Sequence, residues 1–244
     1  MPDTIIFSDL DGTLLDAADY SFAPAAPALD LIRARGIPLV LCSSKTRAEI
    51  EALRRRLDNA HPFIAENGGG IFVPRGYFAE EFEADAFGDY RLIRLGMSYG
   101  EIRKRFVRLR ERLGARMRGF ADMTDDEVAA LTGLPRGEAR LAKQRDFDEA
   151  FVFDGTAGET FLRAIGDAGL HWTQGRFFHI MGDHDKGRAV HLLQSLYRRE
   201  FGAVTSIGLG DSLNDLPMLA AVDRPVLVRR PEVAARRTGA GKRP

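Results

Sequence analysis

The stretch Ile5-Ile6-Phe7-Ser8-Asp9-Leu10-Asp11-Gly12-Thr13-Leu14 decides how we interpret this chain of 244 residues. Its first three residues are apolar and mostly β-branched, which is typical of a buried strand. Asp9 and Asp11 follow two positions apart, and extended backbone places such side chains on one side. Because neighbouring carboxylates repel each other unless a cation lies between them, the pattern favours Mg²⁺ shared with a substrate phosphate. The alternative is an ordinary Asp- and Gly-rich turn.

The composition describes a soluble globular chain, with 45% hydrophobic and 29% charged residues. Lys plus Arg and Asp plus Glu number 35 each, and a neutral chain has no general attraction for nucleic acid or an anionic membrane. The single cysteine, Cys42, excludes an internal disulfide and favours a reducing cytoplasm. No signal segment or long apolar run is visible. We expect a cytoplasmic protein without nucleic-acid or membrane partners, and the oligomeric state stays open.

Strands and helices are expected to alternate at both ends of the chain. The predicted strands are 5–7, 37–42, 63–65, 71–73, 204–209 and 225–228, and the main helices are 24–35, 47–57 and 186–197. Between them we expect helices beside antiparallel strands, after an acidic linker at 77–89. The fold class is therefore α/β, a Rossmann-like parallel sheet core with an inserted α+β unit. The core takes residues 1–80 and 181–244, the insertion takes 81–180, and the chain from Arg229 is a frayed basic tail.

Polar residues follow four of the predicted core strands. Open parallel sheets bind ligands outside the carboxyl ends of their strands, so these residues should share one crevice although they are far apart in sequence. A purely structural cluster is disfavoured because unpaired buried charges cost several kcal/mol. The residues are Asp9, Asp11, Ser43, Ser44, Lys45, Asn67, Gly68, Asp211, Asn214 and Asp215, with Lys186 at a helix start.

Two of these groups also have simpler interpretations. Ser43, Ser44 and Lys45 precede a helix whose N-terminal N–H groups suit a phosphate, but an ordinary helix N-cap would use the same residue types. Asn67 and Gly68 lie in a glycine-rich turn that is typical of a β-hairpin. The functional interpretation is that the turn approaches a ligand closely.

Four segments in order resemble the motifs of the haloacid dehalogenase-like phosphatases: Asp9-Leu-Asp-Gly-Thr13, Ser43, Lys186 and Gly210-Asp-Ser-Leu-Asn-Asp215. The insertion resembles the C2 cap of that superfamily. Within it, the segments 43–47, 66–69, 143–149 and 175–179 resemble the mannosyl-3-phosphoglycerate phosphatases. That resemblance implies hydrolysis of a phosphorylated sugar-glycerate, most simply mannosyl-3-phosphoglycerate to mannosylglycerate, in compatible-solute synthesis.

The resemblance also implies roles for the core residues. Asp9 would form an aspartyl-phosphate, and Asp11 would serve as acid and then as base. Mg²⁺ would be held by Asp9, the backbone carbonyl of Asp11 and Asp211, with Asn214 and Asp215 in support. Lys186 and Ser43 would hold the phosphoryl oxygens.

The cap should grip the rest of the substrate, because a glycerate carboxylate needs a cation and Arg offers it a two-pronged contact. The candidates are Lys143, Arg145, Arg176 and His179, together with Ser44, Lys45, Asn67 and Gly68 from the core. For each cap residue the alternative is a solvated surface charge, and for His179 it is a satisfied core histidine.

Other functions fit the same motifs. The nearest is another C2-capped phosphatase that acts on glucosyl-3-phosphoglycerate, sucrose phosphate or general sugar phosphates. A phosphomutase of the same fold would release no net phosphate, and a non-catalytic sugar-phosphate sensor would not need Asp11 as an acid. Phosphate release across these substrates separates the possibilities.

Overall fold

The strand predicted at the N-terminus lies inside an eight-stranded sheet in the computed structural model, which describes residues 2–17, 19–155 and 158–229. The first five strands in spatial order run parallel to one another, and the last three continue the sheet in antiparallel pairs. In spatial order the strands are β12 (Arg224–Leu227), β11 (Thr205–Gly210), β1 (Thr4–Ser8), β2 (Leu39–Cys42), β3 (Phe63–Ala65), β4 (Gly70–Pro74), β6 (Tyr90–Arg94) and β5 (Asp85–Phe87).

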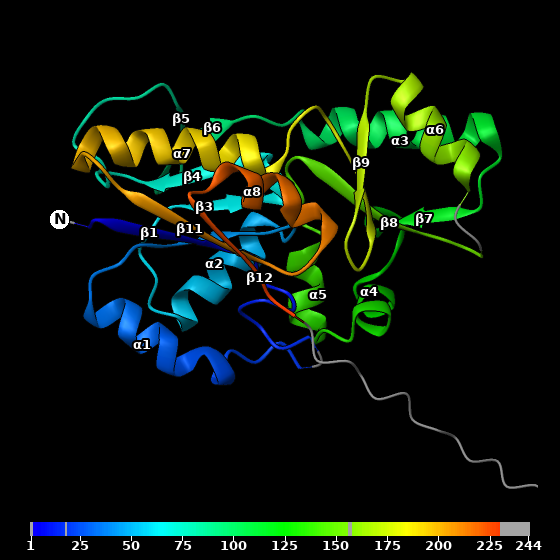
Figure 1. Cartoon of the computed structure of the whole chain (residues 1–244). Coiled ribbons are helices and arrows are strands. Elements are labelled where there is room, and N and C mark those ends of the chain that lie inside the picture. Colours follow the sequence, from blue (N-terminus) through cyan, green and yellow to red (C-terminus); the bar gives the residue numbers. More distant parts are fainter. Residues whose placement is uncertain (1, 18, 156–157, 230–244) are drawn as a thin grey trace, which may run out of the picture.

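Helices cover both faces of this sheet (Figure 1). Alternate residues of β1 point to opposite faces: Ile5 and Phe7 pack against one set of helices and Ile6 against the other. Each fully buried side chain of this size contributes about 1.5–3 kcal/mol. The helices on the face of Ile5 are α7 (Lys186–Phe201) and α8 (Leu216–Ala221), and those on the face of Ile6 are α1 (Ala26–Ala34) and α2 (Arg47–Arg56).

A smaller unit lies beside the larger sheet and has its own antiparallel sheet (Figure 1). Its strands in spatial order are β7 (Met117–Gly119), β8 (Asp148–Phe153), β10 (Phe178–Met181) and β9 (His171–Gln174). One apolar cluster joins this sheet to α3 (Tyr99–Leu113) and α6 (Glu159–Asp167). A second cluster joins it to α4 (Asp125–Thr132) and α5 (Arg136–Ala142), so this sheet too is covered on both faces.

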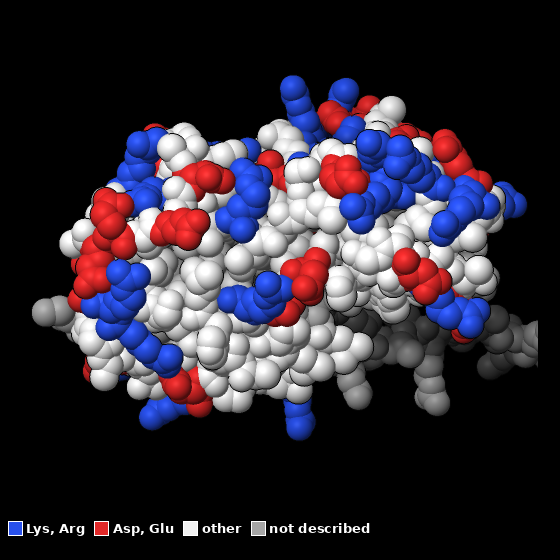
Figure 2. Space-filling model, turned by 90° about the horizontal axis from the view of Figure 1, so that it is seen from above, with Lys and Arg blue, Asp and Glu red and all other residues white. Residues whose placement is uncertain are grey.

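The face seen from above carries charges of both signs (Figure 2). Lys and Arg side chains gather toward the smaller unit, where α3 carries six basic residues. Several of these are ion-paired: Arg110 lies 2.6 Å from Asp122, which Arg103 also contacts, and Arg105 lies 2.8 Å from Glu101. Positive and negative side chains therefore lie side by side on this face, in agreement with the neutral composition of the chain.

The predicted α/β class with an inserted α+β unit is confirmed. The expected boundary at residue 80 does not match the strand pairing, because β6 pairs with β4 and β5 pairs with β6, so both belong to the larger sheet. The expected linker at 77–89 contains β5. We propose instead that the smaller unit begins after Arg94. The predicted basic tail lies outside the described residues, apart from Arg229.

Candidate active site

Three aspartates that are far apart in sequence meet at the carboxyl-end edge of the larger sheet. Asp9 follows β1, Asp211 follows β11, and Asp215 ends the short 3-10 helix η4 (Leu213–Asp215). One carboxylate oxygen of each lies within 4.8 Å of the others. Asp9 and Asp215 are buried, and Asp211 is partly exposed. Three oxygen ligands at this spacing fit a hard divalent cation such as Mg²⁺, which prefers carboxylate and phosphate oxygens.

A buried ammonium lies against the same carboxylates. Lys186 begins α7, and its Nζ is 2.7 Å from Oδ1 of Asp9 and 2.6 Å from Oδ1 of Asp215. Burial raises the pKa of Asp9 to about 7, although Lys186 opposes the rise. Burial would lower the pKa of Lys186, but Asp9 and Asp215 outweigh it and raise that pKa. Three carboxylates beside one ammonium leave an excess of negative charge that a divalent cation would neutralise.

The side chain of Asp11 contacts a different cation and faces a cavity beside the cluster. Its Oδ2 is 3.1 Å from Nζ of Lys45, and this ammonium is also 3.5 Å from Oε1 of Glu49 and 4.9 Å from the centre of the Tyr20 ring. Burial would lower the pKa of Lys45, but Asp11 and Glu49 raise it. A metal contact of Asp11 would therefore use its backbone carbonyl, because its carboxylate faces the cavity and Lys45.

The end of β2 includes an ordinary helix N-cap beside the expected phosphate-binding residues. Thr46 is the N-cap of α2: its Oγ1 accepts the N–H of Glu49 at 3.1 Å, and the Glu49 carboxylate accepts the N–H of Thr46 at 2.9 Å. The N-cap interpretation thus applies to Thr46. Ser43 and Ser44 precede it; Ser44 lines the cavity, and the buried Ser43 accepts the N–H of Lys45 at 3.2 Å.

The turn after β3 joins the smaller unit to the core. The buried carboxylate of Glu66 accepts the backbone N–H groups of residues 146–148 at 2.7 to 3.0 Å. Asn67 has a left-handed backbone with φ of 56°, and its Nδ2 donates to Oδ2 of Asp148 at 3.1 Å. Its Oδ1 accepts from Nδ2 of Asn214 at 3.3 Å. Asn67 therefore connects the acidic cluster with β8.

Gly68 in this turn touches the start of α7, and Gly68→Ala should destabilise the fold. Its φ is +96°, and an added Cβ would lie 2.1 Å from the backbone oxygen of Asp185. Left-handed strain and overpacking against backbone together should cost about 2 kcal/mol or more. Urea unfolding measures this loss. Gly100→Ala, where nothing lies within 4 Å of the added Cβ, is the control, and an equal effect of both changes would contradict the prediction.

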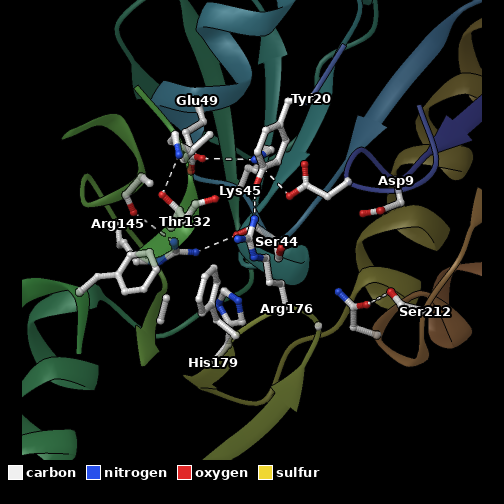
Figure 3. A pocket seen from close by; sticks show the side chains of 18 residues that line it. Asp9, Tyr20, Ser44, Lys45, Glu49, Thr132, Arg145, Arg176, His179 and Ser212 are labelled. Atoms are coloured by element: carbon white, nitrogen blue, oxygen red, sulfur yellow. Dashed lines mark hydrogen bonds and ion pairs between the residues drawn. The ribbon is translucent and has the colours of Figure 1, made fainter. Parts of the chain in front are cut away.

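A cavity between the two units joins the acidic residues to basic groups of the smaller unit (Figure 3). Figure 3 shows Arg145 on the opposite side of the view from Asp9, with Lys45 and Arg176 between them. Arg145 donates from Nη2 to the backbone oxygen of Ser44 at 2.7 Å, and Arg176 donates to the Tyr20 hydroxyl. The residues expected from the sequence that line the cavity are Asp9, Asp11, Ser44, Lys45, Arg145, Arg176, His179 and Asn214.

Comparison with known proteins gives the family. A family model described as haloacid dehalogenase-like hydrolase matches residues 6–86. A glucosyl-3-phosphoglycerate/mannosyl-3-phosphoglycerate phosphatase of Methanococcoides burtonii is 48% identical over 93% of this chain and 85% of its own length. The chain belongs to the haloacid dehalogenase-like hydrolases. A protein of the same description from Persephonella marina is 42% identical over 92% of this chain and 84% of its own length.

Solved structures agree on the fold of this haloacid dehalogenase-like hydrolase. A phosphatase of the superfamily from Bacteroides thetaiotaomicron superposes with a TM-score of 0.63 at 18% identity, over 91% of this chain and 82% of that protein. Within the described part of the chain, no helix combines the length and apolar character needed to cross a membrane.

Lys143 departs from the expectation for this hydrolase. Its Nζ lies 2.9 Å from Oδ1 of Asp125 at the start of α4. Among the described residues, Lys143 does not line the cavity, and Ser43, Asn67 and Gly68 do not line it either. The ion pair with Asp125 holds the Lys143 ammonium at the start of α4 and outside the lining of the cavity. Ser43, Asn67 and Gly68 are buried. Ser43 directly precedes the lining residue Ser44, and Asn67 contacts the lining residue Asn214.

Several residues of the site were not expected from the sequence. Tyr20, Glu49 and Thr132 line the cavity. Asp148 does not line it, but its carboxylate contacts two basic residues that do, Arg145 and His179. Tyr20 lies in the loop after the first motif, where a left-handed φ of 57° is the only local peculiarity, and a sequence does not reveal it. Asp148 lies within the segment 143–149 that resembles a family motif, so that segment held a usable signal.

Proposed function

We propose that this hydrolase removes the phosphate from both glucosyl-3-phosphoglycerate and mannosyl-3-phosphoglycerate. The observation that carries the proposal is the cavity, which is lined by the carboxylates of Asp9 and Asp11 and by the guanidinium groups of Arg145 and Arg176. Such a substrate is anionic at two points, its phosphate and its glycerate carboxylate, and needs a cation at each. The relatives that are 48% and 42% identical carry both sugar names, so we propose both sugars rather than mannose alone.

The chemistry follows from the two carboxylates after β1. An oxygen of Asp9 attacks phosphorus while the bond from phosphorus to the glycerate oxygen breaks, and Asp11 gives that oxygen a proton. Asp11 then takes a proton from water, the water oxygen attacks the aspartyl-phosphate, and Asp9 is released with inorganic phosphate. The placement of the two side chains supports this assignment, because both line the cavity but only Asp9 belongs to the acidic cluster.

Other core residues would hold the phosphoryl group during these steps. Lys186 already contacts Asp9 at 2.7 Å, so an oxygen of the phosphate on Asp9 would lie within reach of its ammonium. Ser43 follows β2, the strand next to β1, and would offer its hydroxyl as a second donor. Positioning and charge stabilisation supply most of the catalysis in phosphoryl transfer.

Asp9, Asp211 and Asp215 are the residues that would hold Mg²⁺, with Asn214 in support. When bound there, Mg²⁺ supplies charge neutralisation between the nucleophile and the phosphate. Asn214 lies in η4 between Ser212 and Asp215, and its amide also contacts Asn67. Ser212 links Asn214 to the cluster, because its hydroxyl contacts Oδ1 of Asn214 and Oδ2 of Asp215.

Phosphate release from a substrate panel tests the proposal. With Mg²⁺ present, kcat/KM for the two glycosyl-3-phosphoglycerates should exceed that for sucrose 6-phosphate and glucose 6-phosphate by at least about 100-fold, because a site built for a carboxylate rejects substrates that lack it. Excess chelator should stop turnover, and added Mg²⁺ should restore it. Equal or faster hydrolysis of the sugar phosphates without glycerate would contradict the proposed substrate class.

A further inference from the structure

Asp148 is a fully buried carboxylate at the start of β8, at the junction of the two units. It does not line the cavity among the described residues, and the proposed mechanism does not use it. Burial alone would raise the pKa of Asp148, but Arg145 and His179 outweigh burial and hold that pKa well below its ordinary value. A fully buried ionised carboxylate is retained only where its partners are well placed, so its contacts need an explanation.

The partners of the Asp148 carboxylate come from both units. Oδ1 accepts from Nε of Arg145. Oδ2 lies 3.0 Å from Nδ1 of His179 and accepts from Nδ2 of Asn67 at 3.1 Å. Asn67 in turn accepts from Asn214, beside the acidic cluster. Asp148 therefore joins two cavity-lining residues of the smaller unit to the acidic rim of the core.

The contact with His179 fixes where that imidazole carries a proton. An ionised carboxylate only accepts hydrogen bonds, so Nδ1 of His179 must be the protonated nitrogen. The other ring nitrogen, Nε2, is then left for a ligand, and in the neutral tautomer it is an acceptor for a sugar or glycerate hydroxyl. The arrangement matches a general pattern in which a carboxylate orients a histidine and sets its tautomer.

We propose that Asp148 is a positioning residue, which fixes the proton of His179 on Nδ1 and holds Arg145 against the core, so that both face the glycosyl-glycerate part of the substrate. The substrate assignment in this inference rests on the proposed function. The alternative is that Asp148 only holds the two units together. The two roles predict different kinetic losses when Asp148 is changed. A positioning role predicts a loss of kcat/KM only for substrates that contact Arg145 and His179, where a misplacement of about 1 Å costs about 100-fold in rate. A merely structural role predicts the same loss for every substrate.

The first test is the kinetics of Asp148→Asn. An amide keeps one acceptor oxygen and replaces the other oxygen of Asp148 with a donor, so Arg145 and His179 can no longer both donate to it. With glucosyl-3-phosphoglycerate and mannosyl-3-phosphoglycerate, kcat/KM should fall about 100-fold, mainly through KM. With p-nitrophenyl phosphate, whose leaving group has neither sugar nor glycerate, the loss should be at least about 10 times smaller. Equal losses with both classes of substrate would show a merely structural role and overturn the proposal.

The matched control is Asp126→Asn, which removes an ion-paired but exposed carboxylate of the same unit, 3.3 Å from Arg136. This variant should keep the wild-type kcat/KM for both classes of substrate. A loss in the control equal to that of Asp148→Asn would also overturn the proposal.

The second test does not depend on the substrate. The chain has five histidines, and comparison of ¹⁵N imidazole spectra with His179→Gln identifies the signals of His179. The wild-type Nδ1 should carry a proton, and Asp148→Asn should shift the ring toward the other tautomer. An unprotonated Nδ1 in the wild type would overturn the proposal even if both glycosyl substrates are hydrolysed. If neither is hydrolysed but Nδ1 is protonated, the proposed function fails and the role of Asp148 in fixing the tautomer stands.

Discussion

Asp9→Asn is expected to lower phosphate release by about 10⁵-fold, the scale of loss when a catalytic nucleophile is removed. The amide nitrogen and oxygen of Asn are too weakly nucleophilic to form the acyl-phosphate intermediate. Asn keeps the shape of Asp, and its oxygen still accepts from Lys186, which lies 2.7 Å from Oδ1 of Asp9. The measurement is release of inorganic phosphate from glucosyl-3-phosphoglycerate with saturating Mg²⁺.

The fold of Asp9→Asn should be retained, and this separates catalysis from stability. Asp9 is buried among like charges, and burial raises its pKa to about 7, so a neutral side chain at this position relieves repulsion with Asp215 and Asp211. We expect an unchanged or higher melting temperature in chelator. The control is Asp30→Asn, an exposed carboxylate 3.0 Å from Arg33, which should keep wild-type activity. Release of phosphate by Asp9→Asn at the wild-type rate would exclude Asp9 as the nucleophile.

The convergence of the acidic residues could be predicted from the sequence because it depends on a topological rule. Apolar runs predicted β1 and β11, and the carboxyl ends of parallel strands meet at one edge of a sheet. The structure brings Asp9, Asp211 and Asp215 within 4.8 Å. The polar residues just after each strand therefore predict where the site lies, and the apolar strands predict which edge of the sheet they share. The position of Lys186 at a helix start also followed from the local pattern, but its insertion between two carboxylates depends on packing.

Pairing between segments without a motif could not be predicted in the same way. Apolar and polar residues alternate in 90–95, which favours a strand, but the pattern does not say which sheet the strand joins. The structure pairs it with β4, so the larger sheet continues past the expected boundary at residue 80. The contact made by the Lys143 side chain could not be predicted from the sequence either. Its nearest carboxylate, on Asp125, lies 18 residues away on another helix, and sequence spacing alone does not reveal that contact.

Asp148 shows why buried polar networks are hard to predict. It stands in an acidic run with Asp146 and Glu149, and no periodicity distinguishes the one that is ionised and paired with both Arg145 and His179. Its partners come from β10, from the turn after β3 and from the chain just before β8. Only the docking of the two units selects it, and docking is a long-range outcome of the fold.

Lys186→Met is expected to lower the free energy of unfolding by about 3–5 kcal/mol in chelator, the cost of removing one partner of a buried ion pair. The ammonium is fully buried between Asp9 and Asp215, at 2.7 and 2.6 Å. Met has a similar volume and leaves no cavity, so the loss reflects two buried carboxylates that are left without this cation. Urea unfolding at about pH 8, where both carboxylates are ionised in the unfolded chain, measures it.

Mg²⁺ provides the test that separates charge from packing in this variant. If Asp9, Asp211 and Asp215 hold the ion, Mg²⁺ neutralises the same carboxylates, and the stability difference between Lys186→Met and wild type should shrink when Mg²⁺ replaces chelator. Phosphate release should stay at least about 100-fold below wild type, because the ion does not replace a donor to the phosphoryl oxygens. Lys104→Met on the exposed side of α3 is the control and should alter stability by at most about 0.5 kcal/mol. A stability loss that Mg²⁺ leaves unchanged would mean that the ion binds elsewhere, because a cation among these three carboxylates must relieve the repulsion that the missing ammonium leaves behind.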